Sequence, residues 1–98
     1  MSGPSPFTNR RTMSVSKAEF AASIAKLGPH EVSAAGHPVF ALGEGRVEIR
    51  YAEAPPKTLG GLLALPQAIV TLDFAGETTA ERETFVRQFD IAFQRGGG

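Results

Sequence analysis

The feature that most constrains the fold is a helix-start signal that occurs twice, on either side of a strand-patterned middle. Ser16 with Glu19, and Thr78 with Glu81, have the S/T-x-x-E spacing of a capping box. In this motif each side chain accepts a hydrogen bond from a backbone amide that the first helical turn leaves unpaired. The chain is therefore expected to begin and end its folded part with a helix.

The segment after the first signal has the periodicity of an amphipathic helix. Phe20, Ile24 and Leu27 fall at i, i+4 and i+7, which places them on one face. A glycine and a proline follow, and these residues end helices. The pattern predicts a helix over residues 17–27.

The segment after the second signal, residues 78–95, has the same character. Its phenylalanines Phe85, Phe89 and Phe93 line one face. Ile91 lies away from that face and is expected to contact solvent. Both helices therefore need an apolar surface to cover.

The middle of the chain supplies that surface as strands. Residues 46–53 alternate apolar and charged side chains, which is typical of a strand with one wet face. Residues 38–42 precede it through a Gly-Glu-Gly turn suited to a hairpin, and residues 66–75 form a further strand. Residues 31–35 are a candidate additional edge strand.

Short links between sequential strands favour antiparallel pairing. The expected fold is an α+β two-layer sandwich in the order α-β-β-β(-β)-α, with an antiparallel sheet of three to four strands. Both helices are expected on one face of that sheet, because each brings a single apolar stripe.

Length and composition indicate one small domain. The chain has 98 residues, of which 42% are hydrophobic, so it has room for one core. We predict that residues 13–95 form this domain. Residues 1–12 are rich in proline, serine and glycine and are predicted to be a disordered N-terminal extension. A start at Met13 remains an alternative.

Several classes of protein are disfavoured by composition. The chain has no cysteine, which removes disulfides and thiol chemistry and fits a cytoplasmic location. No apolar run approaches eighteen residues, so no membrane span is expected. The formal net charge is zero, which does not provide the positive field that nucleic acid requires.

The chain ends in three glycines, residues 96–98, after Arg95. This ending resembles the diglycine tails of ubiquitin-like modifiers and sulfur carriers, and the resemblance would imply a carrier role. In those families the tail follows the last strand of a β-grasp fold, whereas here it follows a predicted helix. The simpler interpretation is a flexible tail beyond a helix stop.

Catalytic and metal-binding patterns are weak. His30 and His37 are seven residues apart and each lies beside a proline, without the spacing of a metal site. The hydroxyls of Ser16 and Thr78 are explained as helix caps, and no nucleophile motif is present. We expect no enzyme activity, no metal and no cofactor.

The wet face of the sheet resembles in position the RNA-binding surface of RRM-like domains. Such surfaces stack bases on aromatic rings and surround them with basic residues. Here the wet face offers Arg50 and Asp73, which are of opposite sign, and no aromatic side chain assigned to it. Nucleic acid is therefore not the expected partner.

The least ordinary stretch is residues 54–67, which we expect to be a connection of about a dozen residues. Its leucines surround a flexible glycine pair. They either fold back to complete a small core or stand exposed as a recognition loop. The second alternative predicts a non-catalytic protein-interaction or assembly module that binds an unidentified protein or a second copy. The expected contacts are Leu59, Gly60, Gly61, Leu62, Leu63 and Ile91.

A different function class is a small-molecule-binding domain. An apolar ligand would lie between helices and sheet, against Phe20, Tyr51, Phe85 and Phe89, where Tyr51 offers a polar group. A cavity at this place would favour this alternative, and a close-packed core would oppose it.

Overall fold

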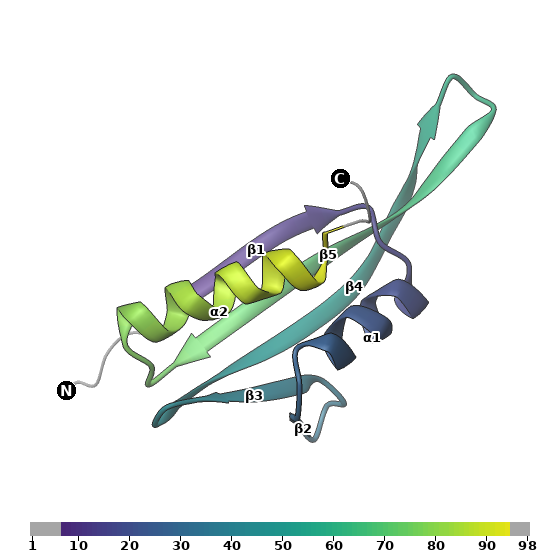
Figure 1. Ribbon diagram of the computed structural model, residues 1–98. Helices are drawn as coiled ribbons and strands as arrows, with labels where there is room; N and C mark the ends of the chain where they lie inside the picture. The colour runs from purple at the N-terminus through teal and green to yellow at the C-terminus, as the bar shows by residue number, and fades with distance from the viewer. Residues whose placement is uncertain (1–6, 95–98) are drawn as a thin grey trace.

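The structure is a computed structural model that describes residues 7–94. In this part of the chain it has five strands and two helices (Figure 1). In chain order they are β1 (Phe7–Met13), α1 (Lys17–Lys26), β2 (Glu31–Val32), β3 (Pro38–Leu42), β4 (Gly45–Leu59), β5 (Leu63–Ala75) and α2 (Thr79–Ala92).

The five strands form one sheet in the order β1-β5-β4-β3-β2, and every neighbouring pair is antiparallel. The predicted α+β class with an antiparallel sheet and two helices is therefore confirmed. The predicted number of three to four strands is wrong, because the sheet has five in the described residues. Only the first two residues of the candidate strand at 31–35 are paired.

The additional strand is β1, in a segment predicted to be disordered. Residues 7–12 of that predicted extension pair with β5, so the expectation of disorder is wrong for them. Phe7 packs edge-on against Phe74, with 6.1 Å between the ring centroids, and the Arg11 guanidinium lies 5.4 Å from the centre of the Phe89 ring. Backbone pairing and cation–π contacts thus order a segment that carries little apolar side chain. The first six residues lie outside the described part.

Both helices begin as predicted. The Ser16 side chain accepts from the Glu19 amide at 3.1 Å, and the Glu19 carboxylate accepts from the Ser16 amide at 2.9 Å. Thr78 and Glu81 make the same reciprocal pair. These bonds satisfy amide groups that each helix start leaves without an intrahelical acceptor. Both capping boxes are confirmed.

The core lies between the helices and alternate residues of the central strands. Phe20 of α1 packs on Tyr51 of β4, with 4.9 Å between the ring centroids. Phe85 of α2 packs edge-on against Phe74 of β5 at 6.1 Å. The fully buried core residues are large and apolar, which makes this cluster the main source of stability; they are Phe74, Phe89, Ile49, Leu72, Val47 and Val70.

The predicted connection over residues 54–67 is wrong, since this stretch is strand. β4 continues to Leu59 and β5 resumes at Leu63, and the two pair up to that last position. Figure 1 shows this two-stranded part projecting well beyond both helices. We call residues 54–67 the ribbon. It makes the molecule elongated, with principal extents of 52 × 27 × 24 Å.

Candidate functional site

The candidate site is the end of the ribbon, which a glycine pair closes. Gly60 and Gly61 have φ of 64° and 76°. Positive φ at two consecutive residues is what a tight hairpin turn of type I′ requires, and glycine adopts it without a Cβ clash. The Leu62 amide donates to the Leu59 carbonyl across this turn at 3.4 Å. The glycines therefore fold the chain back and leave the leucines at the extreme end.

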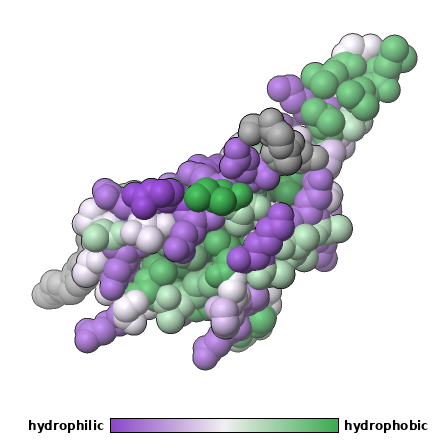
Figure 2. All heavy atoms as spheres, viewed as in Figure 1, coloured by the Kyte–Doolittle hydropathy of each residue, from purple (hydrophilic) through white to green (hydrophobic). Residues whose placement is uncertain are grey.

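Three leucines at this end are exposed, and we call Leu59, Leu62 and Leu63 the leucine tip. Leu62 is 98% exposed, Leu63 54% and Leu59 43%. Figure 2 shows the end of the ribbon as a continuous group of hydrophobic spheres, set apart from the body of the molecule. Of the two alternatives for these leucines, the structure has the exposed one. Their exposure costs hydrophobic free energy that the monomer does not recover.

The ribbon carries a β-bulge at its base. Ala54 pairs with Gln67 and Lys57 with Leu65, so two residues of β4 stand opposite one of β5. The two bulged residues of β4 are Pro55 and Pro56, and the residue opposite them on β5 is Pro66. Proline has no amide hydrogen, so all three positions lack a donor for a further strand.

Beyond this point the outer edges of the ribbon have no strand beside them. In the described residues β3 pairs with β4 only as far as Glu48, and β1 pairs with β5 only as far as Ala68. Exposed edges of this kind invite pairing with another chain, and prolines are one of the devices that prevent it. The ribbon is thus suited to contact through side chains and not through its backbone.

One side of the ribbon is largely apolar. Cross-strand partners project to the same side, and residues two apart on a strand do so too. Leu59, Leu63 and Leu65 therefore share a side with Ala52 and Ile69 nearer the sheet. Together with Ala54 they form a set that we call the apolar row, which consists of Ala52, Ala54, Leu59, Leu63, Leu65 and Ile69. Only Lys57 and Gln67 interrupt it between the tip and Ile69.

The apolar row ends at a hollow of about 340 Å³ on the sheet. Six residues, apolar and polar, line it; they are Thr8, Arg10, Arg50, Ala52, Ile69 and Thr71. Arg50 donates to Asp73 at 2.8 Å, and the Thr8 hydroxyl donates to the same carboxylate at 3.0 Å. These contacts hold the Thr8 and Arg50 side chains in place and offset the charge of Arg50.

Ile91 is exposed, as predicted, but it is not part of the tip. It is 64% exposed on α2 and lies beside Leu27 of α1, in a shallow groove. None of the tip leucines lines that groove. The structure therefore brings together five of the six expected contact residues and leaves Ile91 on a separate surface.

The four residues of the alternative ligand site do not line one cavity. Phe20 and Tyr51 border an open groove of about 450 Å³. Phe85 instead packs on Phe40 at 5.4 Å between ring centroids, and Phe89 stacks on Phe93 at 4.3 Å. Burial raises the pKa of Tyr51, with a further contribution from the nearby Glu53 carboxylate. The small-molecule alternative stays a prediction without a dedicated pocket.

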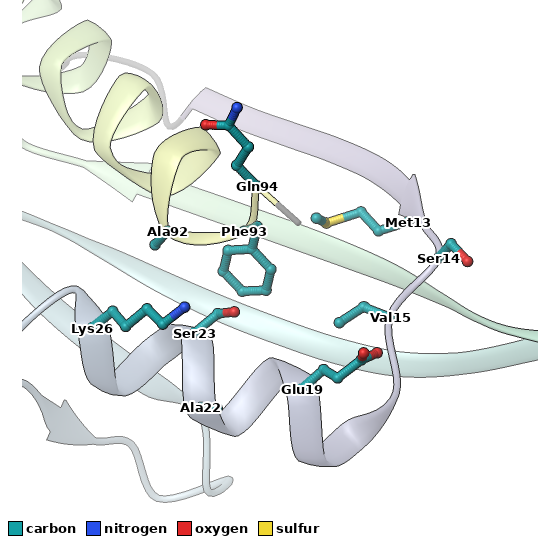
Figure 3. Close-up of a pocket in the computed structure, with 10 residues that line it drawn as sticks. All are labelled: Met13, Ser14, Val15, Glu19, Ala22, Ser23, Lys26, Ala92, Phe93 and Gln94. Carbon is teal, nitrogen blue, oxygen red and sulfur yellow. The ribbon is translucent and has the colours of Figure 1, made fainter. Parts of the chain in front are cut away.

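Another hollow, of about 540 Å³, lies between α1 and the end of α2 (Figure 3). In this view the Phe93 ring points into the space between the helices, and Ser23 and Lys26 of α1 border it. The lining mixes apolar, hydroxyl and charged groups without a convergent set of titratable side chains. We assign no chemistry to it.

The two histidines have separate structural contacts. His30 packs on Phe40 with 4.8 Å between the ring centroids, and its Nδ1 lies 3.0 Å from the Gly28 carbonyl. The Nδ1 of His37 lies 2.8 Å from the Glu48 carboxylate. This hydrogen bond lowers the pKa of Glu48 below its ordinary value.

The described residues have neither a cluster of metal ligands nor a helix that could span a membrane. No group of three or more metal-ligating side chains gathers between residues 7 and 94. Neither α1 nor α2 has the length and apolar character needed to cross a membrane. The glycines at 96–98, on which the carrier alternative depends, lie outside the described part.

The apolar row is the feature that sequence reasoning missed. The sequence predicts a connection over residues 54–67, and a connection has no regular side-chain alternation that would define a side. Taken as a strand, Leu63, Leu65 and Ile69 recur at even spacing and so fall on one side. The paired prolines in turn argue against a strand, because proline cannot donate a hydrogen bond to a neighbouring strand.

The chain was compared with protein-family models, with curated proteins and with solved structures, and no match was found in any of the three.

Proposed function

We propose that this protein is a non-catalytic interaction module that binds a protein partner through the leucine tip. The observation that carries the proposal is the near-complete exposure of Leu62 at the end of a projecting ribbon. Apolar residues that cluster on an exposed projection are typical of protein–protein contacts. Burying a leucine side chain contributes about 1.5–3 kcal/mol, so three leucines can anchor a contact.

The arrangement of the rest of the molecule supports the proposal. Both helices would cover one face of the sheet, and the apolar row on the other side would remain available to the partner. The prolines of the ribbon disfavour strand addition, so recognition would depend on the shape and polarity of side chains. A cysteine-free chain fits a cytoplasmic setting for this contact.

Site-specific photo-crosslinking in the native host tests the proposal. A photoreactive amino acid replaces Leu62 in one variant and Thr58, on the opposite side of the ribbon, in the matched control. A third variant carries it at Val32, an exposed apolar residue of β2 that is 65% exposed. We expect a discrete protein adduct from position 62 and little or none from the two controls.

The same experiment can contradict the proposal. If position 62 forms no adduct, or forms the same adducts as position 32, the leucine tip is not a binding site. Adding Leu59→Asp to the variant labelled at position 62 provides a further check. A genuine apolar contact should lose most of its adduct when a carboxylate enters the tip.

A further inference from the structure

Resting on the proposed function, we infer that the partner at the leucine tip is a second copy of this chain. The two ribbons pack side against side about a two-fold axis, with their apolar rows in contact. Each leucine tip then lies in the hollow of the other copy, against Ala52 and Ile69. Such an interface is isologous, since the same residues serve as projection and hollow on both copies.

The leucine tip and the hollow have the spacing that this packing needs. Leu63 and Ile69 are six residues apart on one continuous strand, which corresponds to about 20 Å. In a two-fold arrangement with antiparallel ribbons, the distance from tip to hollow is identical in both copies. Both tips can therefore be accommodated at the same time. Midway between tip and hollow, Leu65 of each copy then lies against Gln67 of the other.

Charge permits this contact between identical surfaces. A surface that meets its own copy must avoid like charges directly opposite one another. The side of the ribbon that carries the apolar row has Lys57 as its one charged residue between the tip and the hollow. At the hollow, Arg50 is paired with Asp73, and Arg10 adds a second positive charge that the uncharged leucine tip of the other copy does not oppose. The chain has a formal net charge of zero, so the copies do not repel each other at long range.

The ribbon itself gains from being covered. A two-stranded antiparallel ribbon is marginally stable in water unless it packs against another layer. A second ribbon supplies that layer and removes the tip leucines from water. The prolines at the bulge prevent the alternative of open-ended edge-to-edge pairing, so association stops at two copies.

The size of the contact sets its strength. The side of the ribbon that makes the contact is about 20 Å long and about 10 Å wide. Its area is smaller than the roughly 800 Å² that each partner buries in a standard interface. We therefore expect a weak dimer that is populated only at high protein concentration and dissociates on dilution.

Sedimentation velocity over a wide concentration range tests the inference first. The mass of the purified chain should rise from 10.4 kDa towards twice that value with concentration. Leu62→Asp should keep the chain monomeric over the same range. The matched control, Val32→Asp, places the same carboxylate on another exposed apolar position and should dimerise like the original chain.

Disulfide trapping tests the geometry, because the chain has no cysteine of its own. Equal amounts of Leu62→Cys and Ala52→Cys chains are mixed and oxidised. We expect the mixed disulfide to form at least tenfold faster than the one between Leu62→Cys and Val32→Cys chains. Equal rates, or a chain that is monomeric at every concentration, would overturn the inference.

The outcomes separate this inference from the proposed function. A monomeric chain that still forms an adduct with a different protein from position 62 excludes the dimer and retains the interaction site. A position-62 adduct of twice the chain mass supports both. Failure to form any adduct removes both. Binding of the purified monomer to lipid vesicles, abolished by Leu62→Asp, would also count against a second copy as the occupant.

Discussion

Leu59 and Leu63 stand opposite each other at the last paired position of β4 and β5, on the same side of the ribbon. Both remain about half exposed, and the most exposed leucine, Leu62, lies in the turn between them. A hairpin does not need three leucines at its end in order to close, because the glycine pair already provides the turn. Closure of the turn therefore does not account for their position.

The first prediction separates folding from binding at this position. Replacing both Leu59 and Leu63 with threonine keeps the preference for strand but removes apolar surface. We expect the free energy of unfolding to change by less than about 0.5 kcal/mol, as for other surface substitutions. The adduct from position 62 should fall several-fold. A large loss of stability in urea unfolding would mean that these leucines serve the fold.

The second prediction concerns the prolines of the bulge. Pro55→Thr with Pro66→Thr restores amide donors along both outer edges of the ribbon. We expect the variant to aggregate faster, with increased thioflavin binding, because the edges can then pair with other chains. Pro29→Thr is the control, since Pro29 lies in the segment after α1. Equal aggregation of the two variants would show that the ribbon prolines do not protect its edges.

The third prediction concerns Gly45, at the start of β4. A Cβ at this position would lie 2.3 Å from the Glu77 amide nitrogen and 2.3 Å from the Gly76 carbonyl carbon. Both atoms are backbone and cannot move aside cheaply, so Gly45→Ala should cost about 3 kcal/mol.

The comparison variant for Gly45→Ala is Gly61→Ala, where a Cβ has nothing within 4 Å and only the positive φ is unfavourable. That strain alone costs roughly 1–2 kcal/mol. Urea unfolding of both variants measures the difference. If Gly61→Ala proves the more damaging change, the close contact at Gly45 does not exist in solution.

The fourth prediction concerns pH. The His37 hydrogen bond holds the pKa of Glu48 below its ordinary value of 4.5. A carboxyl with a depressed pKa in the folded state contributes stability that is present above 4.5 and lost as pH falls through the folded pKa. Stability should therefore decline below pH 4.5, and less steeply in Glu48→Gln.

His37→Gln completes the pH experiment, because it removes the partner and leaves the carboxyl. Urea unfolding from about pH 3 to about pH 6 covers the range in which carboxyls titrate. It gives the slope of the free energy of unfolding against pH for each variant. We expect a shallower slope in His37→Gln than in the original chain. Identical slopes would show that the His37–Glu48 contact does not govern acid stability.

Local signals were enough to predict the helices and the central strands. The capping boxes at Ser16 and Thr78 act within four residues, so the sequence alone defines the helix starts. The alternation over residues 46–53 likewise needs no tertiary information. The start of each helix and the antiparallel class of the sheet were accordingly predictable.

Pairing between distant segments was not predictable in the same way. β1 is held by β5, more than fifty residues away in sequence, and by contacts such as that between Arg11 and Phe89. Its own composition predicts disorder, because most of its side chains are polar. The ribbon was not predicted for a different reason, because its prolines argue against a strand. β1 thus depends on a distant strand, whereas the two strands of the ribbon pair with each other across a short turn.

β1 has a consequence for where the polypeptide can be shortened. Met13 is the last residue of this strand, so a product begun at Met13 would retain the helices and lose the strand that shields the flank of β5. That product would keep the leucine tip but carry a long bare flank able to recruit strands from other chains. The shortened form would therefore be more prone than the longer one to uncontrolled growth along its side.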